Sequence, residues 1–410
     1  MTALYLAGTG MTKFGLYVDR SVKGMVREAV TACLADAGAT PGDVQAAYFS
    51  NLGQSVIDGQ TAVPGQVALR PLGFQGLPIV NVENGCASAS SALWLACAQL
   101  KAGMADVALA VGAEKLSTVD TTLRDKVFAG GMDVEDVEGT FERLRALGRG
   151  IDGPPAQGER SVFMDVYGCW ARGHMREYGT TQRQLAAIAA KNHRHSAENP
   201  LCQFQKQFSI EEVLAGRALA YPLTVPMCSP YSDGCAAAIV CTERGLARLG
   251  VPRSRAIRLL ACELRSGVDR GLDRFFDLHI TKLTAEAAYA AAGLGPQDVD
   301  LAEVHDATAF GELLNTENLG LVPRGEGGPA AARGETTLGG RIPVNPSGGL
   351  ESRGHPLGAT GLAQIHELVM QLRGEAGPRQ VANARIAIAE NGGGLWGVEE
   401  ASAVVTVLGQ

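Results

Sequence analysis

Cys86 follows a short apolar run and precedes an alanine-rich stretch, in the segment NVENGCASASSAL that spans residues 81–93. The preceding residue, Gly85, allows a sharp turn, and the alanine-rich stretch has the apolar spacing of a helix that Cys86 would open. A thiol at a helix N-terminus lies near free backbone N–H groups and the positive end of the helix dipole, which lower its pKa and favour the thiolate. The pattern favours a nucleophilic cysteine over a buried structural one.

Two histidines stand at comparable turns in the second half of the chain. His305 directly follows the apolar run at residues 301–304, and ligands of open α/β sheets bind beyond the carboxyl ends of the strands. His355 lies in the segment NPSGGLESRGHPLGATG, residues 345–361, which precedes another apolar helical pattern. A cysteine and a histidine are the expected pair for an activated sulfur nucleophile.

The last candidate site segment along the chain is another glycine-rich turn. Residues 390–394 read ENGGG and follow an apolar strand pattern. Such a run can present backbone N–H groups to a developing oxyanion. Taken alone, three glycines are more typical of a simple turn.

The chain also repeats itself. Three pairs of segments share their sequence pattern: 37–44 with 292–299, 106–112 with 385–391, and 236–240 with 401–405. The repeat predicts two similar halves in which strands alternate with helices, and hence parallel sheets covered on both faces. Because the segment of His355 takes the place that the segment of Cys86 holds in the first copy, the two side chains should face each other across the pseudo-symmetry axis.

The offset between the copies changes along the chain. It falls from 279 to 165, so the first copy carries roughly 114 additional residues. We expect an inserted subdomain at residues 116–225, an N-terminal half at 1–115 plus 226–248, and a C-terminal half at 249–410. Long insertions in α/β folds usually carry binding functions.

The composition is that of an ordinary globular protein and excludes several classes. The chain has 410 residues, of which 46% are hydrophobic, and a net charge of −7. The acidic balance argues against a nucleic-acid partner, and no apolar run approaches the roughly 18 residues of a membrane span. The nine cysteines lack metal-site spacing, and we see no export signal, so we expect reduced thiols, no bound metal and a cytoplasmic location. His193 and His195 are interpreted as a surface pair at a helix end rather than as metal ligands.

Taken together, the motifs resemble those of the thiolases, most closely the sterol-carrier-protein type. The matching features are the Cys86 segment, the HDA motif at His305, the His355 segment and the closing glycine run, while residues 178–200 look like part of the thiolase loop domain. The resemblance covers nearly the whole chain. It implies an α/β thiolase fold, in which two βαβαβαββ halves form a five-layer αβαβα arrangement, with an inserted loop domain that helps to hold coenzyme A.

The resemblance also implies an acyl-CoA acyltransferase, for 3-oxoacyl-CoA thiolysis or the reverse Claisen condensation through a covalent acyl-cysteine. Carried over, Cys86 is the nucleophile, and His355 activates it and donates a hydrogen bond to the thioester oxygen. His305 takes the place of an oxyanion-hole residue, and the backbone N–H groups of Cys86 and Gly392 would form a second oxyanion hole. Coenzyme A and acyl-CoA are substrates, no cofactor is bound permanently, and a homodimer or dimer of dimers is expected.

The chain departs from the thiolase pattern at the second catalytic thiol. Ordinary thiolases carry it in a closing C-x-G motif, yet the last cysteine here is Cys262; sterol-carrier-type enzymes often carry a cysteine after His-Asp, where this chain has Ala307. Aligning the closing run puts Glu390 in the vacant position, where a carboxylate with a pKa raised by partial burial could exchange a proton. A shift of one residue would bring Asn391 there, and a glutamate in a solvated turn is the other interpretation.

Two other functions stay open. One is a C-acyltransferase or carbon–carbon lyase subunit that works with a small zinc-ribbon/OB-fold partner, as some thiolase relatives do, and the altered second-thiol position favours it. The histidines at 305 and 355 count against the aldolase branch, where tyrosines tend to take such places. The other is a non-catalytic acyl-CoA-binding subunit, which the retention of Cys86, His305 and His355 argues against.

Overall fold

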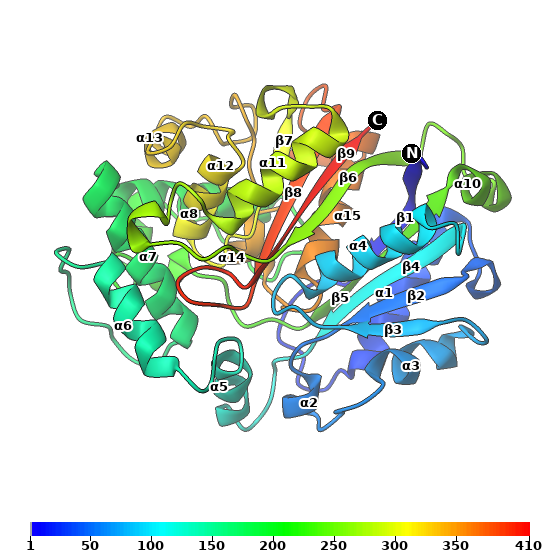
Figure 1. Ribbon diagram of the computed structural model, residues 1–410, viewed down its shortest axis with the longest axis horizontal. Helices are drawn as coiled ribbons and strands as arrows, with labels where there is room; N and C mark the ends of the chain where they lie inside the picture. The colour runs from blue at the N-terminus through cyan, green and yellow to red at the C-terminus, as the bar shows by residue number, and fades with distance from the viewer. Residues whose placement is uncertain (1) are drawn as a thin grey trace.

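A single nine-stranded sheet forms the framework of the computed structural model, which describes residues 2–410 (Figure 1). Its strand order is β3-β2-β4-β5-β1-β6-β9-β8-β7. The first half of the chain supplies β1 (Leu4–Met11), β2 (Ala46–Ser50), β3 (Ile79–Val82), β4 (Val107–Glu114) and β5 (Gly234–Thr242). The second half supplies β6 (Ile257–Arg265), β7 (Leu301–Glu303), β8 (Ile386–Gly393) and β9 (Ser402–Gly409). The two half-sheets join where β1 pairs antiparallel with β6 over three residue pairs.

Helices cover both half-sheets and fill the space between them. The inner layer consists of α4 (Ser88–Lys101) and α15 (Thr360–Arg373), which contact each other and strands of both half-sheets. The outer layers are α1 (Val22–Ala37) and α3 (Pro64–Leu69) on the first half-sheet, and α11 (Ile280–Ala292) on the second. This is the five-layer αβαβα arrangement of the expected α/β fold.

The sequence explains why the layers pack so closely. Strands β1, β4, β5 and β9 are buried at every residue, as strands covered on both faces must be. Small residues let the inner helices approach: a Cβ added at Gly361 of α15 would lie 2.0 Å from the hydroxyl of Ser90 on α4. The site segments at the N-terminal ends of these two helices are therefore held next to each other.

The predicted duplication is visible in matched elements. Strands β4 and β8 each have eight residues and start 279 residues apart, which is the offset that the sequence predicts. Helices α4 and α15 each have 14 residues. Between β4 and β5 the first half has residues 115–233, whereas the second half joins β8 to β9 with residues 394–401. This difference supports the proposed division into two halves and an insertion.

The inserted segment is helical and packs on the second half. Its helices are α5 (Thr122–Ala129), α6 (Val137–Leu147), α7 (Val162–Tyr178), α8 (Gln182–Ala197) and α9 (Ile210–Leu214), on the left in Figure 1. Their core includes Trp170 and Leu185, together with Phe310 of α12 (Ala309–Asn318) in the second half. The remaining helices are α2 (Gln54–Ile57), α10 (Glu243–Leu249), α13 (Gly327–Ala332) and α14 (Gly349–Arg353). Within residues 2–410, no helix combines the length and the apolar character that crossing a membrane requires.

The surface location expected for His193 and His195 is wrong. Both side chains are buried, because α8 is covered by α12, α13 and α14 of the second half. His193 bonds the hydroxyl of Ser352 and the carbonyl of Pro226, and His195 bonds the carbonyl of Asn345. The two imidazoles thus attach the insertion to the segment that carries His355.

Candidate active site

Cys86 lies in a tight turn between β3 and α4. Gly85 has a left-handed φ of 58°, and a Cβ added there would lie 2.5 Å from the backbone nitrogen of Gly394. The hydroxyl of Ser88 accepts from the backbone N–H of Asn84 at 2.8 Å and donates to the carbonyl of Gly85 at 2.6 Å, which closes the turn. All nine cysteines are free, and eight are buried, whereas Cys86 is partly exposed. The turn therefore presents one accessible thiol.

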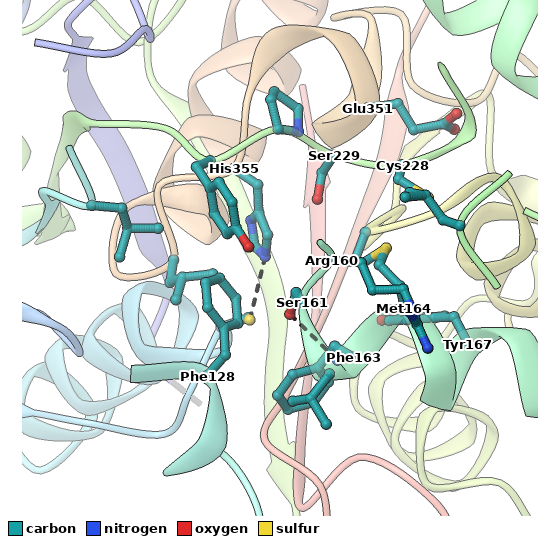
Figure 2. A pocket seen from close by; sticks show the side chains of 18 of the residues that line it. Phe128, Arg160, Ser161, Phe163, Met164, Tyr167, Cys228, Ser229, Glu351 and His355 are labelled. Atoms are coloured by element: carbon teal, nitrogen blue, oxygen red, sulfur yellow. Dashed lines mark hydrogen bonds between the residues drawn. The ribbon is translucent and has the colours of Figure 1, made fainter. Parts of the chain in front are cut away.

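His355 meets this thiol from the other half of the chain. Its Nε2 lies 3.3 Å from Cys86 Sγ, a contact that Figure 2 marks with a dashed line. The loop that carries His355 is fixed from the first half, because the hydroxyl of Ser232 accepts from the His355 backbone N–H at 2.9 Å. The structure thus brings together the two side chains that the duplication predicts to face each other.

The hydrogen bonds around His355 define which nitrogen carries its proton. The Thr360 hydroxyl lies 2.7 Å from His355 Nδ1 and donates its own proton to the carbonyl of Pro356 at 3.0 Å. The oxygen of Thr360 must then accept from Nδ1–H, because a hydroxyl has only one proton to give. This tautomer leaves Nε2 with a free lone pair directed at the sulfur. His355 is therefore arranged to take the proton of Cys86.

The resting thiol is not the thiolate that the helix N-terminus suggests. Helix α4 begins at Ser88, two residues after Cys86, and burial raises the pKa of Cys86 to about 12, with the nearby carboxylate of Glu114 adding to the shift. Burial, with the charges of neighbouring His305 and Arg353, holds the pKa of His355 well below its usual range. Desolvation thus outweighs the N–H groups near the sulfur, and the resting pair is a neutral thiol and a neutral imidazole.

His305 completes a cluster of three side chains. Its Nε2 lies 3.4 Å from Nε2 of His355, and burial lowers the pKa of His305 to about 4. The one lone pair of His355 Nε2 is directed at the sulfur, so an Nε2–H of His305 is left to donate into the cavity, and the buried Nδ1 of His305 has no hydrogen-bond partner in the described part of the chain. A neutral donor aimed into the site fits the expected oxyanion-hole role.

The three ligand atoms of Cys86, His305 and His355 lie within 4.8 Å of one another. A thiol and two imidazoles are also donor types that zinc accepts. The proton transfer described here needs only the side chains themselves, and the absence of a resident metal stays a prediction.

Glu390 does not occupy the vacant position that the alignment gives it. Its buried carboxylate accepts from the backbone N–H of His305 at 3.0 Å and from the hydroxyl of Thr281 at 3.2 Å, and it is not among the residues that line the cavity. Burial and the nearby Glu400 raise its pKa to about 8. The predicted rise in pKa is present, yet the side chain points beneath the loop of His305, so Glu390 positions that loop. Neither a solvated turn nor the one-residue shift fits, because Asn391 is also buried and outside the lining.

Glu400 is a residue of the site that the sequence does not reveal. This buried carboxylate lines the cavity together with Cys86, His305 and His355. It belongs to the short connection between β8 and β9, and no motif in the sequence marks it. Its place in the site becomes visible only in the structure, where the connection folds over the cavity.

The cavity in front of Cys86 has a volume of about 1200 Å³ and continues between the first half and the insertion (Figure 2). Its lining carries many aromatic side chains: Phe128, Phe163, Tyr167, Trp170, Phe204, Phe208 and Tyr231. Four cationic side chains also line it: Arg124, Arg160, Lys206 and Arg217. Five carboxyl side chains line it as well: Asp125, Glu159, Asp165, Glu351 and Glu400. An apolar chamber with charged groups of both signs suits an amphiphilic ligand that has an apolar group and a charged, polar part.

Known proteins with similar sequences share this architecture. The family model "Thiolase, N-terminal domain" matches residues 4–211, and "Thiolase C-terminal domain-like" matches residues 274–410. Sterol carrier protein 2 from Oryctolagus cuniculus is 38% identical over 95% of this chain and 69% of its own length. Benzoylsuccinyl-CoA thiolase subunit BbsB from Thauera aromatica is 38% identical over 92% of this chain and 91% of its own length. Among solved structures, the Ltp2-ChsH2(DUF35) aldolase matches 99% of this chain and 97% of its own with a TM-score of 0.75 at 23% identity.

The raised pKa of Cys86 predicts slow, strongly pH-dependent alkylation of the resting protein. With a pKa of about 12, the reactive thiolate is on the order of 10⁻⁵ of the population at pH 7, so iodoacetamide should modify Cys86 more slowly than free cysteine. The rate should rise about tenfold per pH unit between pH 7 and 10. Intact mass measures the modification, and a Cys86→Ser variant corrects for the other thiols. A rate that stays constant from pH 6 to 9 would show a preformed thiolate instead.

Proposed function

This chain belongs to the thiolase family of acyltransferases, and we propose that Cys86 is the residue that carries the acyl group. The observation that supports this most strongly is the 3.3 Å contact between Cys86 Sγ and Nε2 of His355. Eight other cysteines are buried, and burial raises the pKa of several of them, such as Cys33 and Cys202. Of the nine, Cys86 is the one that combines access to the cavity with an adjacent base.

The first half-reaction follows from this geometry. Nε2 of His355 takes the proton of Cys86 as the sulfur attacks the carbonyl carbon of an acyl-CoA. When the tetrahedral intermediate collapses, the bond to the coenzyme A sulfur breaks, and protonated His355 returns the proton to that sulfur. The products are acyl-Cys86, free coenzyme A and a neutral His355. A neutral resting pair avoids a buried charge until the substrate arrives.

We assign the oxyanion of this step to backbone N–H groups of Cys86 and Gly392, and that of the second step to Nε2–H of His305. Support comes from the packing of the glycine run against the Cys86 turn: a Cβ added at Gly393 would lie 2.2 Å from the carbonyl of Asn84. Gly392 itself is in β8, opposite Ala403, and the next two glycines line the cavity. A donor in such a site typically contributes about 10²–10³-fold in rate.

Acyl loading tests this assignment directly. Incubation with acyl-CoA should add one acyl group to the parent protein, and Cys86→Ala should form no adduct because it has no sulfur. His355→Asn should load at least about 10²-fold more slowly, since it removes the proton acceptor. Intact-mass spectrometry at successive times gives both rates. A stable adduct on Cys86→Ala, or binding of acyl-CoA without any adduct on the parent, would reject Cys86 as the nucleophile, and the latter result would point to a binding subunit.

We propose that the acyl group is bulky and apolar. The sulfur packs beside a small apolar cluster of Leu116, Val127 and Leu357, and the rings of Phe128 and Tyr231 lie 5.4 Å apart against the same cluster. The cations at the cavity, including Arg124 over the ring of Tyr231, suit the phosphates of coenzyme A. The similar chain BbsB is named for benzoylsuccinyl-CoA, an aromatic acyl thioester.

A panel of thioesters should show this preference. Each buried methylene stabilises binding by about 0.8 kcal/mol, or roughly fourfold, so a phenyl or hexanoyl group should load Cys86 on the order of 10²-fold more efficiently than acetyl. Phe128→Ala removes one ring of the lining and should reduce the ratio between bulky and acetyl thioesters. The measured quantity is kcat/KM for coenzyme A release. Equal values for acetyl and phenyl thioesters would contradict a bulky acyl substrate.

A second candidate is a carbon–carbon bond-forming or -breaking subunit that works with a small zinc-ribbon/OB-fold partner. The absent second thiol favours it, as does the fold shared with an aldolase described together with a DUF35 partner.

A second copy of this chain is the other expected partner: β3 is an edge strand, and 43% of Val80 on it is exposed. The nine free thiols fit the cytoplasm, and acyl-CoA substrates fit lipid metabolism.

A further inference from the structure

Neither usual position of the second thiol holds a cysteine here, but the cavity has another proton-transfer group. Cys228 also lines the cavity, yet it is 8% exposed and burial raises its pKa well above the usual value, which makes it a poor base. Ala307, at the position where sterol-carrier-type thiolases often have a cysteine, contributes only a methyl group to the lining. Glu390 is tied to the backbone N–H of His305 and to Thr281, outside the lining. Carbon–carbon chemistry at acyl-Cys86 still needs a base for the α-carbon of the second acyl-CoA.

Glu400 is the carboxylate that reaches this place. It lies over the α-carbon of Gly392: a Cβ added to Gly392 would be 2.8 Å from Cγ and 3.2 Å from Oε1 of Glu400. Glycine at position 392 therefore leaves the space that the Glu400 side chain occupies. The proximity of Glu400 also raises the pKa of Cys86 and opposes the burial-induced fall in the pKa of His305, which places its charge beside both groups.

His279 lies beside this carboxylate. Nδ1 of His279 accepts from the backbone N–H of Thr281 at 3.3 Å, so the imidazole proton sits on Nε2, which lies 3.1 Å from Glu400 Oε2. Burial acts to raise the pKa of Glu400, and the contact with His279 outweighs it, so the pKa lies below its usual value. Glu400 Oε2 has no aligned hydrogen-bond donor among residues 2–410, so this oxygen has a lone pair available to accept a proton.

The connection that carries Glu400 is held at several points. Trp170 Nε1 of α7 donates to the carbonyl of Val398 at 2.7 Å, and the backbone N–H of Leu395 donates to the carbonyl of Gly131 at 2.8 Å. Next to Glu400, Glu399 accepts from the N-terminal backbone N–H of α11 and pairs with Arg270. In Figure 1 this connection between β8 and β9 reaches towards the inserted helices. A base on such a rigid connection is positioned before the substrate binds.

We propose that Glu400 is the base that takes the α-proton of the second acyl-CoA, in place of the missing thiol. The inference rests on the proposed acyl-Cys86. In condensation, the carboxylate removes the α-proton, the electron pair of that C–H bond forms the new C–C bond to the acyl carbon, and the bond from that carbon to Cys86 breaks. The proton on Glu400 then returns to the Cys86 sulfur, which restores thiol and carboxylate. In thiolysis, the Glu400 carboxylate takes the proton of the Cys86 thiol as the sulfur attacks the carbonyl carbon, and gives it to the α-carbon of the departing acyl-CoA when the C–C bond breaks.

The test separates acyl loading from α-carbon chemistry. Glu400→Gln should still form acyl-Cys86, measured by intact mass, because the base of the loading step is His355. The same variant should lower α-proton exchange of acyl-CoA in D₂O, followed by proton NMR, and condensation by about 10²–10⁴-fold. Glu400→Asp should restore part of the exchange because it returns a carboxylate. Exchange at the parental rate in Glu400→Gln overturns the proposal, and so does an equal loss of loading and exchange in both Glu400 variants.

Glu390→Gln is the matched comparison, because it replaces another buried carboxyl group, on the strand β8 that leads into the connection of Glu400. Since Glu390 acts through the His305 backbone, this variant should change loading and exchange by the same factor. Selective loss of exchange in Glu390→Gln, with Glu400→Gln unaffected, would make Glu390 the base. A parent protein that forms no acyl adduct with any thioester would contradict the proposed function itself, whereas a parent that loads acyl groups and an active Glu400→Gln would contradict only this inference.

Discussion

The contact between one sulfur and one imidazole depends on nearly every layer of this protein. Cys86 comes from the turn before α4 and His355 from the segment before α15, and the two helices meet in the inner layer between the half-sheets. Burial there disfavours the charged form of both partners, so the thiol and the imidazole rest as a neutral pair. The resulting constraint is geometric. Because the resting protein has no preformed thiolate, the Cys86 thiol and the His355 imidazole must already be in contact before the proton is transferred.

Buried carboxylates keep that geometry. Glu303 pairs with Arg353 and accepts from the backbone N–H of Ser347, Asp306 accepts from Leu350, and Glu114 of the first half accepts from Gly358. These bonds fix the His355 segment on both sides of the imidazole. Removing one partner of a buried ion pair such as Glu303 and Arg353 lowers the free energy of unfolding by about 3–5 kcal/mol, because the other charge stays buried without a partner. The pair therefore holds the His355 segment in place by an amount of this order. Glu390 has the same role for His305, because its carboxyl group accepts from the His305 backbone N–H and fixes that loop.

The sequence predicts the architecture because its two halves share a repeated pattern. Matching segments gave both the α/β layering and the facing of Cys86 and His355, and the offset of 279 relates β4 to β8 in the structure. What it could not predict depends on desolvation and on how connections fold. The helix N-terminus suggested a lowered pKa for Cys86, but burial acts more strongly. An alignment placed Glu390 in the cavity, but its carboxyl group is bonded to the backbone N–H of His305 and to Thr281 outside the lining. Glu400 enters the cavity from a connection that has no sequence motif.

The protonation state of His355 tests the account most directly. In protein labelled with ¹⁵N-histidine, the resonances of His355, identified by their loss in His355→Gln, report whether each ring nitrogen carries a proton. The hydrogen bonds to Thr360 and Cys86 predict a neutral ring at pH 7, protonated at Nδ1 and unprotonated at Nε2. A doubly protonated ring at pH 7, or a neutral ring with its proton on Nε2, would contradict the neutral thiol–imidazole pair on which the proposed chemistry depends.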